Sequence, residues 1–116
     1  MPQTTPNDRR DLFPGALEMM ILRVLQREPM HGYALAQRIK AASEELLQVE
    51  EGSLYPALQR MLKENWVQAA WGVSSTNRRV RVYTVTKAGS DRLAAEITRF
   101  ERMLKGIQLV LNAELV

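Results

Sequence analysis

The sequence contains no cysteine and only one histidine, His31. Without cysteine the chain can form neither a disulfide nor a thiolate metal site, a composition that suits a reducing cytosol. A single histidine cannot supply the histidine pair that a zinc site without thiolates would need. Because His31 stands beside a glycine in an expected turn, we interpret it as structural, and we expect neither a metal ion nor a cofactor.

Long apolar runs are also missing. No segment approaches the roughly 20 uninterrupted apolar residues of a membrane-spanning helix, and the start of the chain lacks the apolar run of a signal peptide. The sequence has no internal repeat and no low-complexity tract. At 116 residues it is most simply one domain with an extension, and we expect it to be cytoplasmic, without a membrane partner.

Acidic residues are absent from positions 65–90, a stretch that holds four basic residues: Arg78, Arg79, Arg81 and Lys87. The net charge of the whole chain is only +3, so the distribution of charge is more informative than its total. A solvated segment can carry such charge by chance. This segment begins at the end of residues 49–66, which predict a helix with a basic face, and the two together favour an acidic partner.

Residues 49–66 predict a helix with two different faces, around which the rest of the sequence can be arranged. Ser53 is expected to cap the free backbone N–H groups at its start, and Pro56 is expected in its first turn. One face is apolar, with Leu54, Ala57, Leu58, Met61 and Leu62. The other carries Tyr55, Pro56, Gln59, Arg60 and Lys63. An ordinary solvated surface is the alternative interpretation of this second face.

The flanking segments are regular as well. Residues 16–25 are apolar on nearly every side, which predicts a helix buried from several directions. Residues 33–47 predict a second helix with one apolar stripe. Beyond the third helix the period becomes that of strands, and residues 66–73 and 79–85 predict a β-hairpin with its turn at 74–78.

A long final helix is predicted to begin near Thr86 or Ser90. Its apolar residues follow a 4-3-4-3-4 spacing, which is typical of a coiled-coil seam. The seam residues are Leu93, Ile97, Phe100, Leu104, Ile107 and Leu111. Packing wholly against its own domain is the alternative, but a small domain lacks the surface to cover both this seam and the apolar first helix. We therefore expect a homodimer joined through the last helix.

The order helix–helix–helix–strand–strand–helix is that of a winged helix-turn-helix. We therefore predict a mainly α fold with a small β-hairpin, in which a winged helix-turn-helix is followed by a long C-terminal dimerisation helix. The predicted division is a flexible N-terminal arm at 1–11, a DNA-binding domain at 12–86 and the dimerisation helix at 87–116. In such a fold the third helix can enter the major groove while the hairpin, or wing, lies along a neighbouring groove.

Five motifs occur in consistent order over residues 12–100: LFPGALEMMILRVL, PMHGYALAQRI, VEEGSLYPALQRMLKENW, NRRVRVYTVT and KAG. In these motifs, and above all in HGY followed by GSLYPAL, the sequence resembles the PadR-like family of transcriptional regulators. The resemblance implies a homodimeric bacterial repressor that binds double-stranded operator DNA through its third helix and wing. It also implies that a small aromatic or drug-like effector releases some members from DNA.

Transferred to this sequence, the resemblance implies DNA contacts from the third helix and the wing. The residues concerned are Ser53, Tyr55, Pro56, Gln59, Arg60, Lys63, Arg78, Arg79 and Arg81. We expect Tyr55 to contact phosphate or base, and Arg78, nearest the hairpin tip, to bind phosphate. Strand alternation puts Arg79 and Arg81 on the face opposite Val80. Base-edge contacts cannot be assigned from these patterns.

Two pairs of residues complicate this interpretation. Glu50 and Glu51 lie beside the start of the third helix, where carboxylates suit the helix dipole but repel phosphate. Trp66 and Trp71 are expected to pack in the core and the hairpin. A dimer-interface cavity lined by such aromatic side chains is the alternative, and it could bind a planar apolar effector.

We expect no enzyme, because the sequence has no phosphate-binding glycine motif and no group of residues with assignable catalytic roles. The remaining alternative is a protein-interaction module that pairs through its last helix, with an incidental basic wing. Loss of duplex affinity with added salt would favour DNA binding. Salt-insensitive binding to a protein would favour the alternative.

Overall fold

A computed structural model describes residues 15–115, which fold into four helices and three strands. In chain order these are α1 (Ala16–Arg27), β1 (Met30–His31), α2 (Gly32–Ala42), α3 (Glu51–Lys63), β2 (Val67–Val73), β3 (Arg79–Val85) and α4 (Lys87–Leu111). The predicted winged helix-turn-helix with a long last helix is therefore confirmed. The predicted arm at 1–11 lies outside the described residues, and the division into domains stays a prediction.

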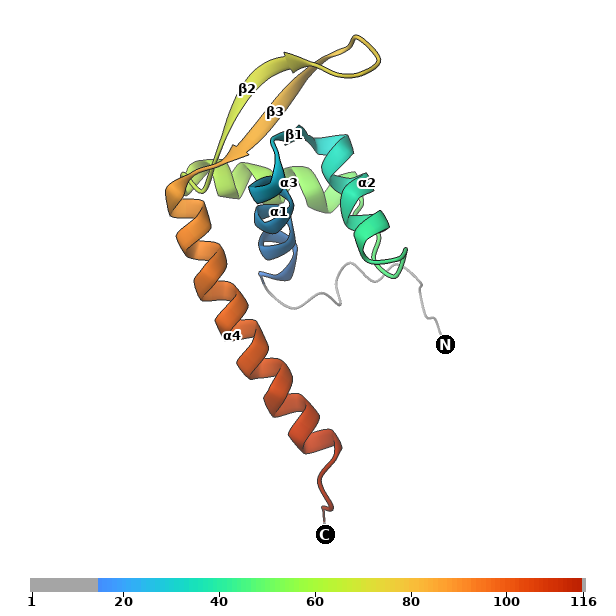
Figure 1. Ribbon diagram of the computed structural model, residues 1–116, viewed down its shortest axis with the longest axis vertical. Helices are drawn as coiled ribbons and strands as arrows, with labels where there is room; N and C mark the ends of the chain where they lie inside the picture. Colours follow the sequence, from blue (N-terminus) through green and yellow to red (C-terminus); the bar gives the residue numbers. More distant parts are fainter. Residues whose placement is uncertain (1–14, 116) are drawn as a thin grey trace.

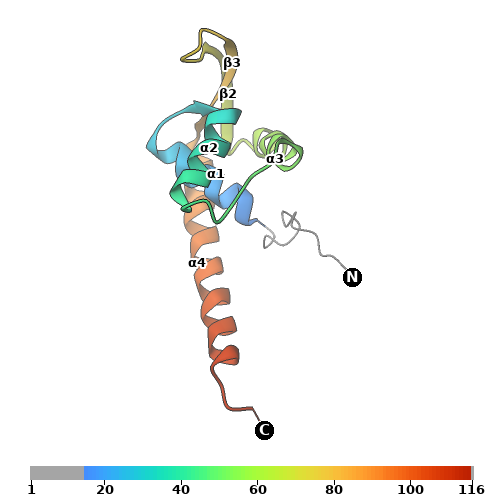
Figure 2. The same ribbon diagram turned by 90° about the vertical axis from the view of Figure 1, so that its right-hand side faces the viewer.

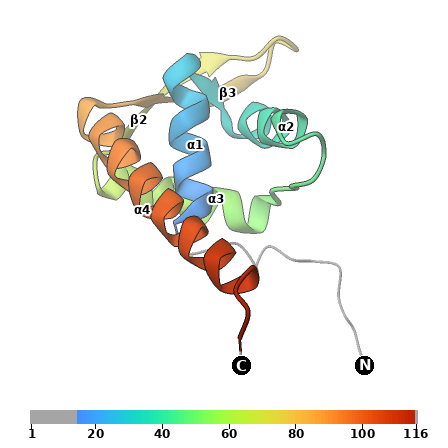
Figure 3. The same cartoon turned by 60° about the horizontal axis from the view of Figure 1, so that its bottom comes forward.

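The hairpin and the last helix extend in opposite directions from the three-helix domain. Figures 1 and 2 show the wing, made of β2 and β3, at one end of the molecule and the free end of α4 at the other. Figure 3 shows α1 lying between α4 and α2. The wing and the free end of α4 are consequently far apart, with α3 between them.

The apolar faces of all three small helices meet in one core. Ile21, Leu35 and Leu58, from α1, α2 and α3, are each fully buried. Val67 and Tyr83 add the base of the wing to this core. Burial of apolar surface between elements that are distant in the sequence is the main stabilising term here.

The sheet has three strands in the order β1-β3-β2. The predicted hairpin is confirmed, with Val67 opposite Val85 and Trp71 opposite Arg81. β1 was not predicted, because two residues are too few to show an alternating pattern. Their pairing with Tyr83 and Val82 of β3 ties the start of α2 to the base of the wing.

The predicted start of the third helix is wrong by one turn. α3 begins at Glu51 with Glu50 as the N-cap residue, and no side chain caps it. The N–H of Ser53 already donates to the Glu50 carbonyl at 2.9 Å, so Ser53 lies within the helix. Pro56 is therefore in the second turn, where its missing N–H removes the bond to the Gly52 carbonyl. Gly52 and Pro56 are both exposed, so water can donate a hydrogen bond to the Gly52 carbonyl.

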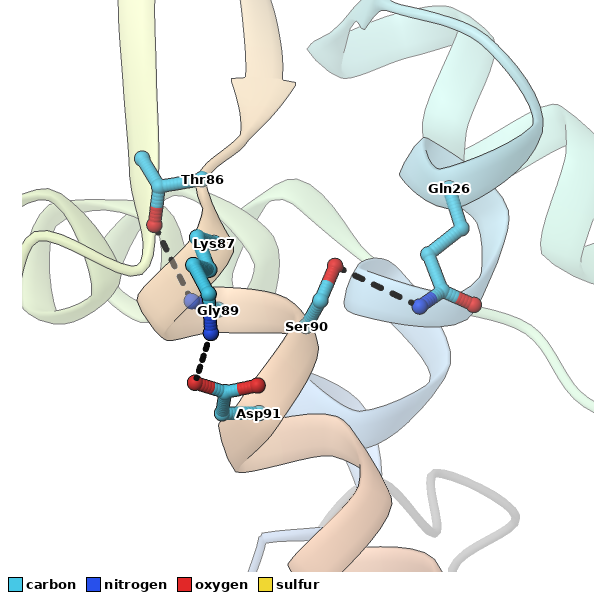
Figure 4. Close-up of polar contacts among 6 residues, drawn as sticks. All are labelled: Gln26, Thr86, Lys87, Gly89, Ser90 and Asp91. Atoms are coloured by element: carbon cyan, nitrogen blue, oxygen red, sulfur yellow. Dashed lines mark hydrogen bonds and ion pairs between the residues drawn. The ribbon is translucent and has the colours of Figure 1, made fainter.

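The end of β3 and the start of α4 are locked against the end of α3. Thr86 caps α4 by accepting from the Gly89 N–H at 3.0 Å (Figure 4). The Thr86 hydroxyl also donates to the Asn65 carbonyl at 2.7 Å. Asn65 has a left-handed backbone, with φ of 62°. A Cβ at Gly89 would overlap the carbonyl oxygen of Trp66. Only glycine therefore permits this approach, which explains the KAG motif. Of the two predicted caps, Thr86 and Ser90, it is Thr86 that caps α4.

Only the first half of α4 packs against the domain. Leu93 is 1% exposed and Ile97 packs against the same core, beside α1. Leu93 is thus part of its own protomer's core, and the predicted dimer seam is too long at this end. Leu104 and Leu111 are 38% and 76% exposed. Within residues 15–115, no helix is both long enough and apolar enough to cross a membrane.

Substitution of Gly89 tests the lock at the start of α4. Gly89→Ala should lower the free energy of unfolding by about 2 kcal/mol or more, because the new methyl group meets backbone that cannot rotate away. Urea denaturation at a fixed protein concentration measures the change. Ala88→Ser, at the exposed neighbouring position, should stay within about 0.5 kcal/mol of the unsubstituted protein. Equal stability of the two variants would contradict the close approach.

Candidate nucleic-acid interface

The outer face of α3 and one face of the wing line a common cleft of about 360 Å³. Tyr55 and Gln59 come from α3, and Trp71, Arg79 and Arg81 come from the wing. The two arginines share a face with Trp71 because Arg81 is its cross-strand partner and Arg79 lies two residues earlier in β3. The structure thus brings polar and aromatic side chains of α3, β2 and β3 to one surface.

Tyr55 packs over the start of α2. A Cβ at Gly32 would come within 2.7 Å of the Tyr55 hydroxyl oxygen and within 2.9 Å of its ring carbon Cζ. Gly32 belongs to the HGY motif and Tyr55 to the GSLYPAL motif, so the two motifs are linked by direct contact. Tyr55 remains 40% exposed, which leaves its hydroxyl accessible from the cleft.

The surroundings of Tyr55 affect the pKa of its hydroxyl and the charge that a ligand would meet beside it. Partial burial, the Glu51 carboxylate and Tyr83 together raise the pKa of the Tyr55 hydroxyl above its usual 10.0. The phenol therefore keeps its proton at neutral pH and can donate a hydrogen bond to an anionic oxygen. Glu51 lies one turn before Tyr55 on the same side of α3. A phosphate that approached Tyr55 would therefore be repelled by this carboxylate.

Arg60 is held by another helix. Its guanidinium donates to Glu18 of α1 through Nε at 3.2 Å and Nη2 at 2.8 Å. A partner 42 residues away in sequence cannot be found from helical periodicity. This ion pair favours a role for Arg60 in fixing α3 on α1. Lys63 is exposed in the last turn of α3, Pro56 is also exposed, and Ser53 is half-buried. Their contacts with DNA stay predictions.

The turn of the wing is ordered by its own hydrogen bonds. The Ser74 N–H donates to the Arg78 carbonyl at 2.8 Å, and the Arg78 N–H donates to the Ser74 hydroxyl at 3.2 Å. Asn77 supplies the left-handed residue of the turn, with φ of 63°. The side chain of Arg78 borders a second cleft, of about 840 Å³, between the turn and α2. Arg78 is therefore separated from Arg79 and Arg81, which border the cleft beside α3.

The second cleft also contains residues outside the predicted DNA-contacting set. Tyr33 and Arg38 of α2 border it opposite the wing turn, and Tyr33 is exposed. Arg38 also pairs with Glu28 at 3.3 Å, although both side chains are largely exposed, so this ion pair is weak. Tyr33 and Arg38 both belong to the second helix of the sequence, where periodicity alone does not distinguish a cation that borders a cleft from an ordinary solvent-exposed one.

The two tryptophans lie in different environments. Trp66 is half-buried beside the Arg92 guanidinium, whose carbon lies 4.8 Å from the ring centroid. Trp71 is 60% exposed on the wing. Trp71 lies in the hairpin, where the sequence predicts that it packs, and its ring contacts are with the wing arginines Arg79 and Arg81. The alternative of an aromatic-lined effector cavity at a dimer interface stays a prediction.

The family can be assigned from a match over most of the chain. A sequence model of the transcriptional regulator PadR-like family matches residues 21–95, which run from α1 into α4. The chain belongs to the PadR-like family of transcriptional regulators. PadR-family regulators bind DNA through a winged helix and are generally not enzymes. The matched residues include both elements that line the cleft.

Several known proteins are similar to this PadR-like chain. A transcriptional regulator from Clostridium thermocellum has a solved structure with a TM-score of 0.77 and 26% identity, covering 84% of this chain and 95% of that one. A PadR-like transcriptional regulator from Bacillus cereus has a TM-score of 0.72 and 28% identity, covering 87% and 96%. An uncharacterized protein of Lysinibacillus sphaericus is 26% identical over 104 residues, covering 90% of this chain and 95% of its own.

The contact between the two PadR-like motifs can be tested with a double-mutant cycle. Gly32→Ala should lower the free energy of unfolding by about 1 kcal/mol, because Tyr55 must move away from the added methyl group. In a Tyr55→Ala background the same change should be neutral or slightly stabilising, because the clash is gone and the unfolded chain loses entropy. Urea denaturation of all four proteins measures the coupling. An equal effect in both backgrounds would show that the side chains do not touch.

Proposed function

We propose that this PadR-like protein is a homodimeric repressor that binds a pseudo-palindromic operator with α3 and the wing. The observation that carries the proposal is the shared cleft, in which Tyr55 and Gln59 face Arg79 and Arg81. A groove between a helix and a basic hairpin suits a DNA strand, because the helix can enter the major groove while the arginines neutralise neighbouring phosphates. Phosphate contacts fix the position of the protein, and base contacts from α3 supply specificity.

The distal half of α4 supports the dimer. Met103, Ile107, Val110 and Leu111 lie around Gly106 on one side of the helix, and they border an open apolar groove of about 500 Å³. No neighbouring atom lies within 4 Å of a Cβ placed on Gly106, so a second helix can approach closely there. An apolar face of this kind is unusual on a monomer. A second copy of α4, related by a two-fold axis, would cover it.

A two-fold dimer sets the form of the operator. Two copies of α3 would enter successive major grooves about 34 Å apart, so the half-sites should be inverted repeats. Selecting bound fragments from the source genome tests this directly, and neighbouring genes would identify the regulated function. Recovery of fragments without a shared inverted repeat would contradict the proposal. Release by a small aromatic or drug-like effector remains a prediction from the family resemblance.

The dimer interface can be tested with two apolar residues of α4. Ile107→Lys should give a monomer, because it puts a charge into the apolar groove around Gly106. Leu109 is exposed, does not border the groove and lies about 160° around the helix from Ile107, so Leu109→Lys should leave the dimer intact. Sedimentation equilibrium at micromolar concentration measures both masses. A dimeric Ile107→Lys variant would contradict an interface at this groove.

The wing arginines can be tested by the salt dependence of binding. Arg78→Ala and Arg79→Ala should each weaken binding to all duplexes about equally and reduce the salt slope by roughly one unit per lost phosphate contact. Fluorescence anisotropy with operator and unrelated DNA measures both quantities. Arg102→Ala on the exposed side of α4 is the control and should leave the slope unchanged. A change in sequence preference at constant slope would contradict the positioning role.

A further inference from the structure

We infer that Trp71 is a positioning residue for DNA binding, which holds the Arg79 and Arg81 side chains on the α3 side of the wing. The inference rests on the proposed function, since it assigns to Trp71 the task of preparing two phosphate ligands. It gives a reason for a large exposed aromatic side chain that packing does not explain. Trp71 has 60% of its surface exposed, although its strand contributes Val67 to the core.

The pairing of β2 with β3 places aromatic rings and guanidinium groups in one stack. The guanidinium carbon of Arg79 lies 4.2 Å from the centroid of the Trp71 ring, and that of Arg81 lies 5.9 Å from it. Both distances fall within the range of a cation–π interaction, for which tryptophan is the best partner. Arg81 also lies 6.0 Å from the Tyr83 centroid. Two aromatic rings and two guanidinium groups thus alternate along one face of the wing.

The stack leaves the arginines able to bind an anion. A ring contacts the flat face of a guanidinium, so the N–H groups around its edge stay available for phosphate oxygens. Within residues 15–115, no carboxylate forms an ion pair with Arg79 or Arg81. An arginine whose side chain is already held loses less conformational freedom when it binds. Trp71 therefore supplies order without neutralising the charge.

A second stack in the same protein shows the contrast. Arg92 lies over Trp66 at 4.8 Å, but its guanidinium also pairs with Glu96 at 2.8 Å. Glu96 is largely buried and accepts from Arg99 as well, at 2.9 Å. The charge of Arg92 is therefore neutralised within α4, and that stack is structural. The stack on the wing has the same kind of contact but no such carboxylate.

The inference predicts how substitutions of Trp71 combine with those of the arginines. Trp71→Leu keeps an apolar side chain but removes the aromatic face, and it should weaken duplex binding about three- to tenfold. Trp71→Phe keeps an aromatic face and should retain most of the affinity. In an Arg79→Ala, Arg81→Ala background, Trp71→Leu should have no further effect. An equal loss in that background would mean that Trp71 touches DNA itself, and it would overturn the inference.

A measurement on the free protein separates this inference from the proposed function. Nitrogen-15 relaxation of the Arg79 Nε–H group should show a lower order parameter in Trp71→Leu than in the unsubstituted protein, with backbone order in β2 and β3 unchanged. Equal Arg79 order in the two proteins would overturn the inference, whatever the binding data show. Absence of salt-dependent duplex binding by the unsubstituted protein would instead contradict the proposed function.

Discussion

The approach of Gly89 to the Trp66 carbonyl is the constraint on which the rest of the architecture depends. At this point the end of α3, the base of the wing and the start of α4 meet, and Thr86 bonds to backbone on both sides of the junction. A side chain larger than hydrogen at Gly89 would push α4 away from the wing. The directions of the wing and of α4 are consequently fixed relative to each other by backbone contact. Such contact is stiffer than side-chain packing, because it has no rotamers to change.

This junction connects the two parts of the proposed function, which are DNA binding by α3 and the wing and dimer formation through α4. If α4 pairs with a second copy, the angle at which it leaves the domain sets the distance between the two α3 helices. The Gln26 side chain of α1 reaches Ser90 at 3.4 Å, and Leu93 anchors the next turn in the core, so α4 is held over its first two turns. The spacing of the two DNA half-sites would then depend on this junction within each protomer as well as on the dimer interface. Any ligand that shifted α4 would also act on the base of the wing.

The sequence predicted the features that depend on local periodicity. The hairpin, the third helix and the cap at Thr86 follow from strand alternation, helical spacing and turn chemistry. It could not predict contacts between distant segments: β1 exists only because β3 lies beside it, and Arg60 is held by a carboxylate on α1. The apolar spacing of α4 correctly predicted a long helix. The spacing could not show that Leu93 packs in the core of its own domain, because packing within a domain and packing in a dimer require the same residue types.

The distribution of charge indicates different tasks for the two elements that line the cleft. Glu51 stands on the same side of α3 as Tyr55, and Arg60 is neutralised by Glu18, so little free positive charge remains on the helix beyond Lys63. The wing has three arginines and no carboxylate. Long-range attraction to DNA would therefore act mainly through the wing, whereas α3 offers neutral hydrogen-bonding groups. A helix that does not attract every phosphate lets correct base contacts decide where the protein stays bound.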